Sequence, residues 1–291
     1  MEFLSYLISG ISLGSVYAII ALGYTMVYGI AKMLNFAHGD IIMVGGYISF
    51  CAMSYLGLPS VLAVVLAMLV CTVLGIVIEG LAYKPLRSAP SLAVLITAIG
   101  VSYLLQNLAL IIFGSQQKAY PSLIELSSFT VGGVTVDGIS VLTLLMTALI
   151  MVVLSFFINK TKLGKAMRAV SEDKNAASLM GISVNRTITL TFAIGSVLAA
   201  FASIFYGMSY VYIKPTTGAM PGIKAFTAAV FGGIGSIPGA LLGGILLGII
   251  ESMAKAYIST QLANSIVFAV LIIMLLVRPA GLLGKYVPEK V

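Results

Sequence analysis

Charged residues are scarce in this chain of 291 residues. They make up 9% of the sequence, whereas hydrophobic residues make up 60% and the mean hydropathy is +1.13. Soluble domains carry about 25% charged residues, so the composition excludes that class and predicts a polytopic membrane protein. The 16 basic residues outnumber the 9 acidic ones, but they cluster at the ends of apolar runs, where basic residues set membrane topology. We therefore expect membrane lipid around the chain and no nucleic-acid partner.

Histidine and cysteine are also rare. His38 is the only histidine, and the two cysteines, Cys51 and Cys71, each lie inside an apolar run. The sequence has no HExxH zinc motif and no GxxxxGK[ST] phosphate-binding loop. The cysteines show no redox, metal or disulfide pattern. We therefore expect neither an enzyme nor a cofactor or metal site, and any use of ATP must belong to a partner.

Ionisable residues inside the apolar runs are few. Glu79 can reach the region of Lys84, and Glu251 has Lys255 four residues further on, which is a favourable helical spacing. Ion-coupled carriers keep carboxylates or histidines in the membrane as a proton or cation relay, and no convincing relay is present. We interpret Glu251 as part of a structural ion pair, with a relay role as the alternative.

The apolar runs predict an all-α transmembrane bundle of about 8–9 spans, in a single domain over residues 1–291, because one crossing takes about 20 residues. The first run has no positive start and no small-residue cleavage site, so we expect an uncleaved span and not a signal peptide. The expected spans lie at about 3–30, 41–57, 61–83, 92–114, 139–159, 187–212, 219–235, 240–258 and 262–277.

The span count depends on the glycine-rich stretch at residues 225–253. Read as one span, it would leave the basic tail outside, against the positive-inside rule; that tail contains Arg278, Lys285 and Lys290. Read as two helices with a turn at residues 235–239, it brings the tail inside. We favour two helices, and a re-entrant half-helix is the alternative.

The same rule orients the rest of the chain. Lys32, Lys84 and Arg87 would face the cytoplasm. The loop at residues 115–138 would face the outside, with Lys118 against Glu125 and Asp137.

Residues 160–186 form the one long charge-rich segment. Its charged residues are Lys160, Lys162, Lys165, Arg168, Lys174 and Arg186, against Glu172 and Asp173. A soluble, helix-prone segment between two spans is where a membrane protein would meet a cytoplasmic partner. The alternative is a solvated loop whose charge only sets orientation.

Glycines recur at small-xxx-small spacing, which lets helix backbones approach closely. The pairs are Gly10 with Gly14, Gly239 with Gly243, and Gly244 with Gly248. We expect tight packing within one subunit, with dimer contact or pore lining as alternatives.

Two segments suggest discontinuous helices, which transporters use to present backbone groups to a substrate. These are residues 34–47, with Asn35, His38 and Asp40, and residues 231–239. For the first, we favour a solvated turn and helix cap at the inner face. Since both segments pair an interrupted helix with a glycine-rich helix, they also hint at an internal repeat.

Several motifs together carry a family resemblance. The sequence NAASLMG at residues 175–181 is similar to the EAA-xxx-G coupling motif of ABC importer permeases, with Asn175 where the motif has Glu. The wider runs at residues 164–182, 12–47 and 226–251 resemble the LivH-like family of branched-chain amino acid permeases. The likeness covers essentially the whole chain.

The resemblance implies a membrane subunit of an ABC importer in the cytoplasmic membrane of a bacterium or archaeon. Its implied partners are a homologous second permease, two cytoplasmic ATPases and an extracytoplasmic binding protein that delivers leucine, isoleucine or valine. Residues 160–186 would be a cytoplasmic coupling loop with two short helices. Its ATPase-coupling residues would be Arg168, Glu172, Asp173, Asn175, Ala176, Ala177 and Gly181. Asp173 can cap the second helix, Ala176 and Ala177 can present a low-profile face, and Gly181 can end the helix.

The same family resemblance allows urea or small amides as alternative substrates. A translocation pathway lined by small and polar residues is expected to include Thr25, Asn35, His38, Thr97, Asn107, Gly232 and Gly233. Two hypotheses from other classes stay open: an ion-coupled secondary carrier that works alone, and a membrane scaffold without transport of its own.

Overall fold

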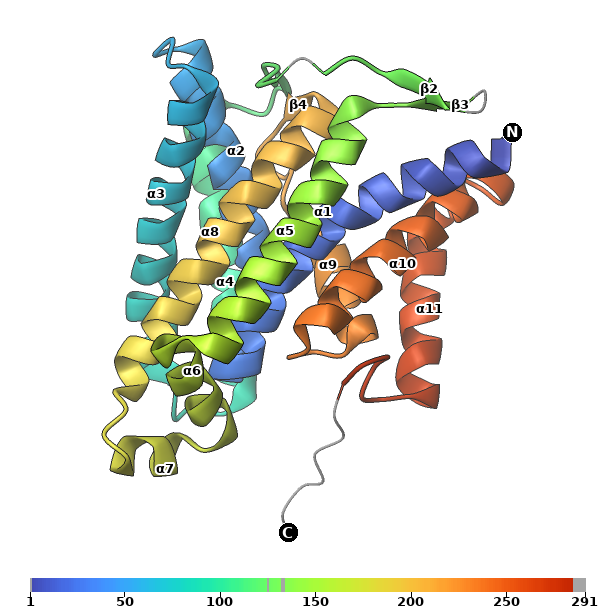
Figure 1. The fold of residues 1–291 in the computed structure, drawn as a ribbon. Helices are drawn as coiled ribbons and strands as arrows, with labels where there is room; N and C mark the ends of the chain where they lie inside the picture. Colours follow the sequence, from blue (N-terminus) through green and yellow to red (C-terminus); the bar gives the residue numbers. More distant parts are fainter. Residues whose placement is uncertain (1, 125, 132–133, 285–291) are drawn as a thin grey trace.

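The computed structural model describes residues 2–124, 126–131 and 134–284. These residues form a bundle of helices (Figure 1), which confirms the predicted all-α class. The bundle helices are α1 (Glu2–Ala31), α2 (His38–Ser54), α3 (Ser60–Ile78), α4 (Ser91–Phe113), α5 (Gly138–Lys160), α8 (Val184–Tyr210), α9 (Ala219–Gly232), α10 (Ile237–Tyr257) and α11 (Ala263–Val277). A π-helical turn η1 (Glu79–Tyr83) and a 3-10 turn η2 (Lys84–Leu86) extend α3.

The two ends of the bundle differ. One end, called here the α6–α7 end, carries the short helices α6 (Lys162–Glu172) and α7 (Lys174–Leu179) at the bottom of Figure 1. The opposite end, called the strand end, carries β1 (Lys118–Ala119), β2 (Phe129–Val131), β3 (Val134–Val136) and β4 (Tyr212–Ile213). Two antiparallel pairs form there, β1 with β4 and β2 with β3.

Six helices among the described residues are long and apolar enough to cross a membrane: α1, α3 with its extension, α4, α5, α8 and α10. The other three bundle helices are shorter, with 17 residues in α2, 14 in α9 and 15 in α11. A full crossing takes about 20 residues. The count of about 8–9 spans therefore stays a prediction. Of the residues used to argue orientation, Glu125, Lys285 and Lys290 lie outside the described part.

The glycine-rich stretch divides into two helices, as predicted. The break comes earlier than expected, at residues 233–236, because Gly233 and Gly235 adopt φ values of 106° and 93° that favour glycine. Ser236 then caps α10 by accepting a hydrogen bond from the Gly239 backbone N–H at 3.2 Å.

Close packing of α1 on α10 lies at the centre of the bundle. A Cβ atom on Gly14 would be 2.6 Å from the Cα of Ile245, and one on Gly248 would be 2.3 Å from the Cα of Gly14. Such distances permit only glycine, so the small-residue spacing serves contacts inside one subunit. This confirms the favoured interpretation of those glycines.

Large apolar side chains cover the outer faces of the peripheral helices. Exposed examples are Val61, Leu69 and Val73 on α3, Leu104 and Ile111 on α4, Leu149 and Val153 on α5, and Ile272 and Leu276 on α11. Apolar faces of this extent are typical of helices in contact with lipid or with another subunit.

Candidate functional site

The segment made of α6 and α7 is shaped by its caps and by one close approach. The Thr161 hydroxyl accepts a hydrogen bond from the Gly164 N–H at 3.0 Å and begins α6. A Cβ on Gly164 would lie 2.4 Å from the carbonyl oxygens of Phe157 and Ile158, so α6 folds back tightly on the end of α5. Met167 and Val170 are buried, which gives α6 one face on the bundle and one on the surface.

Asp173 separates the two short helices. Its carboxylate accepts hydrogen bonds from the N–H groups of Asn175 at 2.8 Å and Ala176 at 3.0 Å, which confirms the predicted cap. Gly181, with a φ of 81°, follows the end of α7 as expected. Most of the other predicted coupling residues lie exposed on this segment: Arg168, Glu172, Asn175 and Ala176.

Ala177 differs from the expectation. The sequence predicts that Ala176 and Ala177 together present a low-profile face, but the Ala177 side chain is only 4% exposed because it packs into the hydrophobic core. Leu179 and Met180 are instead the prominent apolar side chains of the segment, at 88% and 82% exposed. Sequence reasoning missed them, although two consecutive apolar residues at the end of a soluble helix were a signal.

Lys174 connects α7 to the bundle. Its Nζ donates a hydrogen bond to the Ala31 carbonyl oxygen at 3.2 Å, at the last residue of α1. The hydrogen bond satisfies a carbonyl group that has no partner within the helix, because the last carbonyls of a helix lack intrahelical donors. Desolvation lowers the pKa of Lys174, and the nearby positive charges of Arg87 and Lys32 lower it further.

Glu79 finds a partner one turn beyond the predicted region. It forms an ion pair with Arg87 and not with Lys84, because the turn η2 brings Arg87 back over the Glu79 carboxylate. The Thr189 hydroxyl donates to the other carboxylate oxygen of Glu79 at 2.7 Å, and Arg87 also donates to the Asn185 side chain. This network joins the extension of α3 to α8.

The segment between α1 and α2 is buried, and the expected solvated turn is wrong. Asn35, His38 and Asp40 are 3%, 1% and 1% exposed, and Ala37 at the start of α2 offers no side-chain cap. The reason is that α2 begins inside the bundle, where Gly39 lies against the backbone of Gly218.

Partners satisfy two of these three buried side chains. Tyr83 donates to the Asn35 side-chain oxygen at 2.9 Å, and Gln106 donates to the Asp40 carboxylate at 2.9 Å. The His38 ring packs on the Tyr24 ring with centroids 4.6 Å apart, and its nitrogens have no hydrogen-bond partner among the described residues.

The other predicted pathway residues are scattered. Thr25 is buried on α1, Thr97 is half-buried on α4, and Asn107 is exposed on α4 with its amide donating to the Tyr103 carbonyl. Gly232 and Gly233 pack against the backbones of Gly239 and Gly284, respectively. The structure therefore uses these two glycines for close packing, and their place in a pathway stays a prediction.

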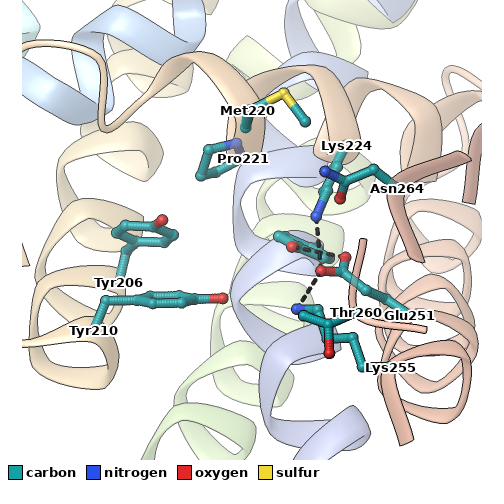
Figure 2. A pocket seen from close by; sticks show the side chains of 10 residues that line it. Tyr206, Tyr210, Met220, Pro221, Lys224, Glu251, Lys255, Thr260 and Asn264 are labelled. Carbon is teal, nitrogen blue, oxygen red and sulfur yellow. Dashed lines mark hydrogen bonds and ion pairs between the residues drawn. The ribbon is translucent and has the colours of Figure 1, made fainter. Parts of the chain in front are cut away.

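A polar pocket of about 230 Å³ lies between α1, α8, α9, α10 and α11 (Figure 2). It is in the half of the bundle nearer the strand end, since it involves the last turns of α8 and α10 and the first turns of α9 and α11. Its lining residues are Tyr17, Tyr206, Tyr210, Met220, Pro221, Lys224, Glu251, Lys255, Thr260 and Asn264.

Glu251 is the centre of the charges in this pocket. One of its carboxylate oxygens accepts from Lys224 Nζ at 2.7 Å and from Lys255 Nζ at 2.6 Å, and the other accepts from the Tyr17 hydroxyl at 3.0 Å. The predicted pair with Lys255 is confirmed. The sequence analysis does not predict the contacts of Lys224 and Tyr17 with Glu251. A lysine within the otherwise apolar helix α9 is the sequence signal that could have identified Lys224.

The chain is a multi-pass integral membrane protein. Its long apolar helices pack closely at glycine contacts, and the charged amphipathic segment α6–α7 lies at one end. A family model described as the permease component of the branched-chain amino acid transport system matches residues 6–276. The chain belongs to this family of transport permeases, and the resemblance found in its sequence is confirmed.

Curated relatives match over nearly their whole length. The chain is 45% identical to the high-affinity branched-chain amino acid transport system permease protein BraD of Pseudomonas aeruginosa, covering 100% of this chain and 98% of the relative. It is 44% identical to the permease protein LivH of the same kind of system in Escherichia coli, with the same coverage.

A solved structure shares the fold. PsaBC from Streptococcus pneumoniae, in complex with Fab, contains a chain that aligns with a TM-score of 0.50 and 18% identity, over 96% of this chain and 93% of that one. At this identity the likeness concerns the fold alone.

Proposed function

We propose that this chain is a membrane subunit of an ATP-driven importer for branched-chain amino acids that works by alternating access. The observation that carries the proposal is the full-length identity of 44–45% to permeases named for high-affinity branched-chain amino acid transport. ATP hydrolysis belongs to two partner ATPases at the α6–α7 end. A homologous second permease and an extracytoplasmic binding protein complete the transporter.

The contact with the ATPases is made by the surface of α6 and α7. Leu179 and Met180 are consecutive residues at the end of α7, and both side chains are exposed. Exposed polar side chains of the same segment lie nearby in the sequence. Exposed apolar anchors with a polar rim are the usual composition of a protein interface. Arg168 and Glu172 supply that rim, and a groove on the ATPase takes the two apolar side chains.

The force of ATPase closure passes from this surface into the bundle. α6 packs on α1, α5 and α8, and α7 packs on α8. Lys174 adds a direct hydrogen bond to the end of α1. Because α1 is the helix around which α8, α9 and α10 pack, a displacement of α7 is transmitted to the helices that surround the polar pocket.

A reconstituted transporter tests this coupling. We expect Leu179→Asp with Met180→Asp to reduce ATP-dependent leucine uptake into proteoliposomes by about tenfold or more, since loss of interface anchors typically costs that much. The matched control is Leu126→Asp with Phe129→Asp, which introduces the same two negative charges on exposed apolar side chains at the strand end. Normal uptake by the double variant, with the ATPases still bound, would contradict the coupling role.

Two competing functions give different results in the same vesicles. Uptake driven by a proton or sodium gradient without ATPases would identify an ion-coupled carrier. If the binding protein bound urea or a small amide and not leucine, the permease would serve that substrate class instead.

A further inference from the structure

The polar pocket carries more positive charge than it neutralises. Lys224 and Lys255 both turn to the single carboxylate of Glu251, which leaves an excess of one positive charge. Glu251 is fully buried and the Lys224 side chain is 8% exposed. The excess charge lies at Lys255, which lines the pocket and is 37% exposed, so a bound anion would complete this arrangement.

Hydrogen-bond donors also remain available in the pocket. An ammonium group has three donors, and among the described residues Glu251 is the hydrogen-bond partner that the structure gives to Lys224 and to Lys255. Glu251, by contrast, already accepts from both lysines and from Tyr17. The free capacity of the cluster therefore lies in donors, which suit a carboxylate.

The rest of the wall suits an amino acid. Figure 2 shows Tyr206 and Tyr210 across the pocket from the ion-paired cluster, with the Tyr210 hydroxyl directed toward it. Thr260 and Asn264 add a hydroxyl and an amide that can accept from an ammonium group. Met220, Pro221 and the tyrosine rings offer apolar surface to a side chain, and the first turn of α9 adds the positive end of a helix dipole.

We propose that this pocket is a binding site for an α-amino acid on its way through the permease, in which Lys224 and Lys255 hold the substrate carboxylate. The inference rests on the proposed function and deepens it. Because an excess positive charge gives no advantage to neutral urea or amides, the pocket selects amino acids over those alternatives. Its position toward the strand end places it on the side opposite the ATPase contact.

Direct binding to the complete transporter, without binding protein and nucleotide, tests the site. We expect labelled leucine to bind and to be displaced by unlabelled leucine. Leucinamide, which lacks the carboxylate, should not displace it. Equal displacement by leucinamide would overturn the proposal.

A second test replaces Lys255. Its side chain is partly exposed, and its replacement leaves the ion pair between Lys224 and Glu251 in place. Lys255→Gln should weaken leucine binding about tenfold, the usual effect of losing a charge-assisted hydrogen bond. Lys255→Arg should restore it. Asn264→Ala removes the amide that accepts from the substrate ammonium group and should also weaken leucine binding. The matched control is Lys118→Gln at the same end but outside the pocket, with binding unchanged.

The outcomes separate the two proposals. Unchanged leucine binding by Lys255→Gln, or no binding by a wild-type complex that still imports leucine, overturns the pocket and leaves the importer function in place. Failure of the wild-type complex with all partners to import leucine overturns the importer function itself.

Discussion

The α6–α7 segment and the polar pocket both concentrate charge, but they do so in opposite surroundings. Charged side chains of the segment such as Arg168 and Glu172 are exposed, and its helices are held by caps and by a few buried apolar residues. The pocket has three charged residues from α9 and α10 with Glu251 fully buried between the lysines. Exposed charges cost little free energy because water solvates them, and they leave a surface that another protein can contact. A charge buried within a membrane protein needs a partner and is typical of a functional site.

The largest effect is expected when the pocket loses its carboxylate. Glu251→Gln leaves the buried Lys224 without its carboxylate partner and beside the positive charge of Lys255, so the free energy of unfolding should fall by about 3–5 kcal/mol. Thermal unfolding of the protein in lipid nanodiscs measures the change. The double variant Glu251→Gln with Lys224→Met removes one of the opposed charges and should recover part of the loss. A single variant as stable as the wild type would mean that the pair is not buried as described.

A moderate effect is expected at the junction of the short helices. Asp173→Ala removes the cap of α7 and should destabilise that helix by about 1 kcal/mol, whereas Asp173→Asn retains an acceptor and should cost little. Hydrogen exchange of the α7 amides reports this local change, with the amides of α10 as the internal reference. Equal exchange in both variants would show that α7 is held by packing and not by its cap.

The smallest effect concerns the pH dependence at Lys174. Its pKa is lowered by desolvation and by Arg87 and Lys32, so protonation opposes the packed position of α7. The stability of α7 should therefore rise as the pH increases from the lowered pKa of Lys174 toward the ordinary value of 10.5.

A fluorophore on the α7 surface, followed over this pH range, measures that change. Lys174→Met should abolish the dependence, while Lys162→Met, at an exposed position on α6, should preserve it. A stability that falls over the same range in the wild type would contradict the assignment.

The sequence predicted one region better than the other. At the α6–α7 segment, the roles of Asp173 as a cap and Gly181 as a helix end follow from local chemistry, and both are observed. Burial of Ala177 and exposure of Leu179 could not be read locally, because they depend on which face of a six-residue helix meets the bundle.

The pocket was harder to predict. The spacing of Glu251 and Lys255 on one helix predicts their contact, but Lys224 is 27 residues away and Tyr17 is 234 residues away from Glu251 along the chain. Likewise, Asn35, His38 and Asp40 look like a solvated turn along the chain, but Tyr83, Tyr24 and Gln106 from other elements contact them in the folded protein.

The amino-acid sequence by itself determined the membrane class, the helical fold, the family and the two capped helices of the α6–α7 segment. Composition, apolar run length and local hydrogen bonding are properties of neighbouring residues, so they can be read along the chain. Tertiary structure decided which charges are buried together and which apolar side chains stay exposed. Those outcomes depend on how α1, α9 and α10 cross, and glycine contacts between distant segments set that crossing.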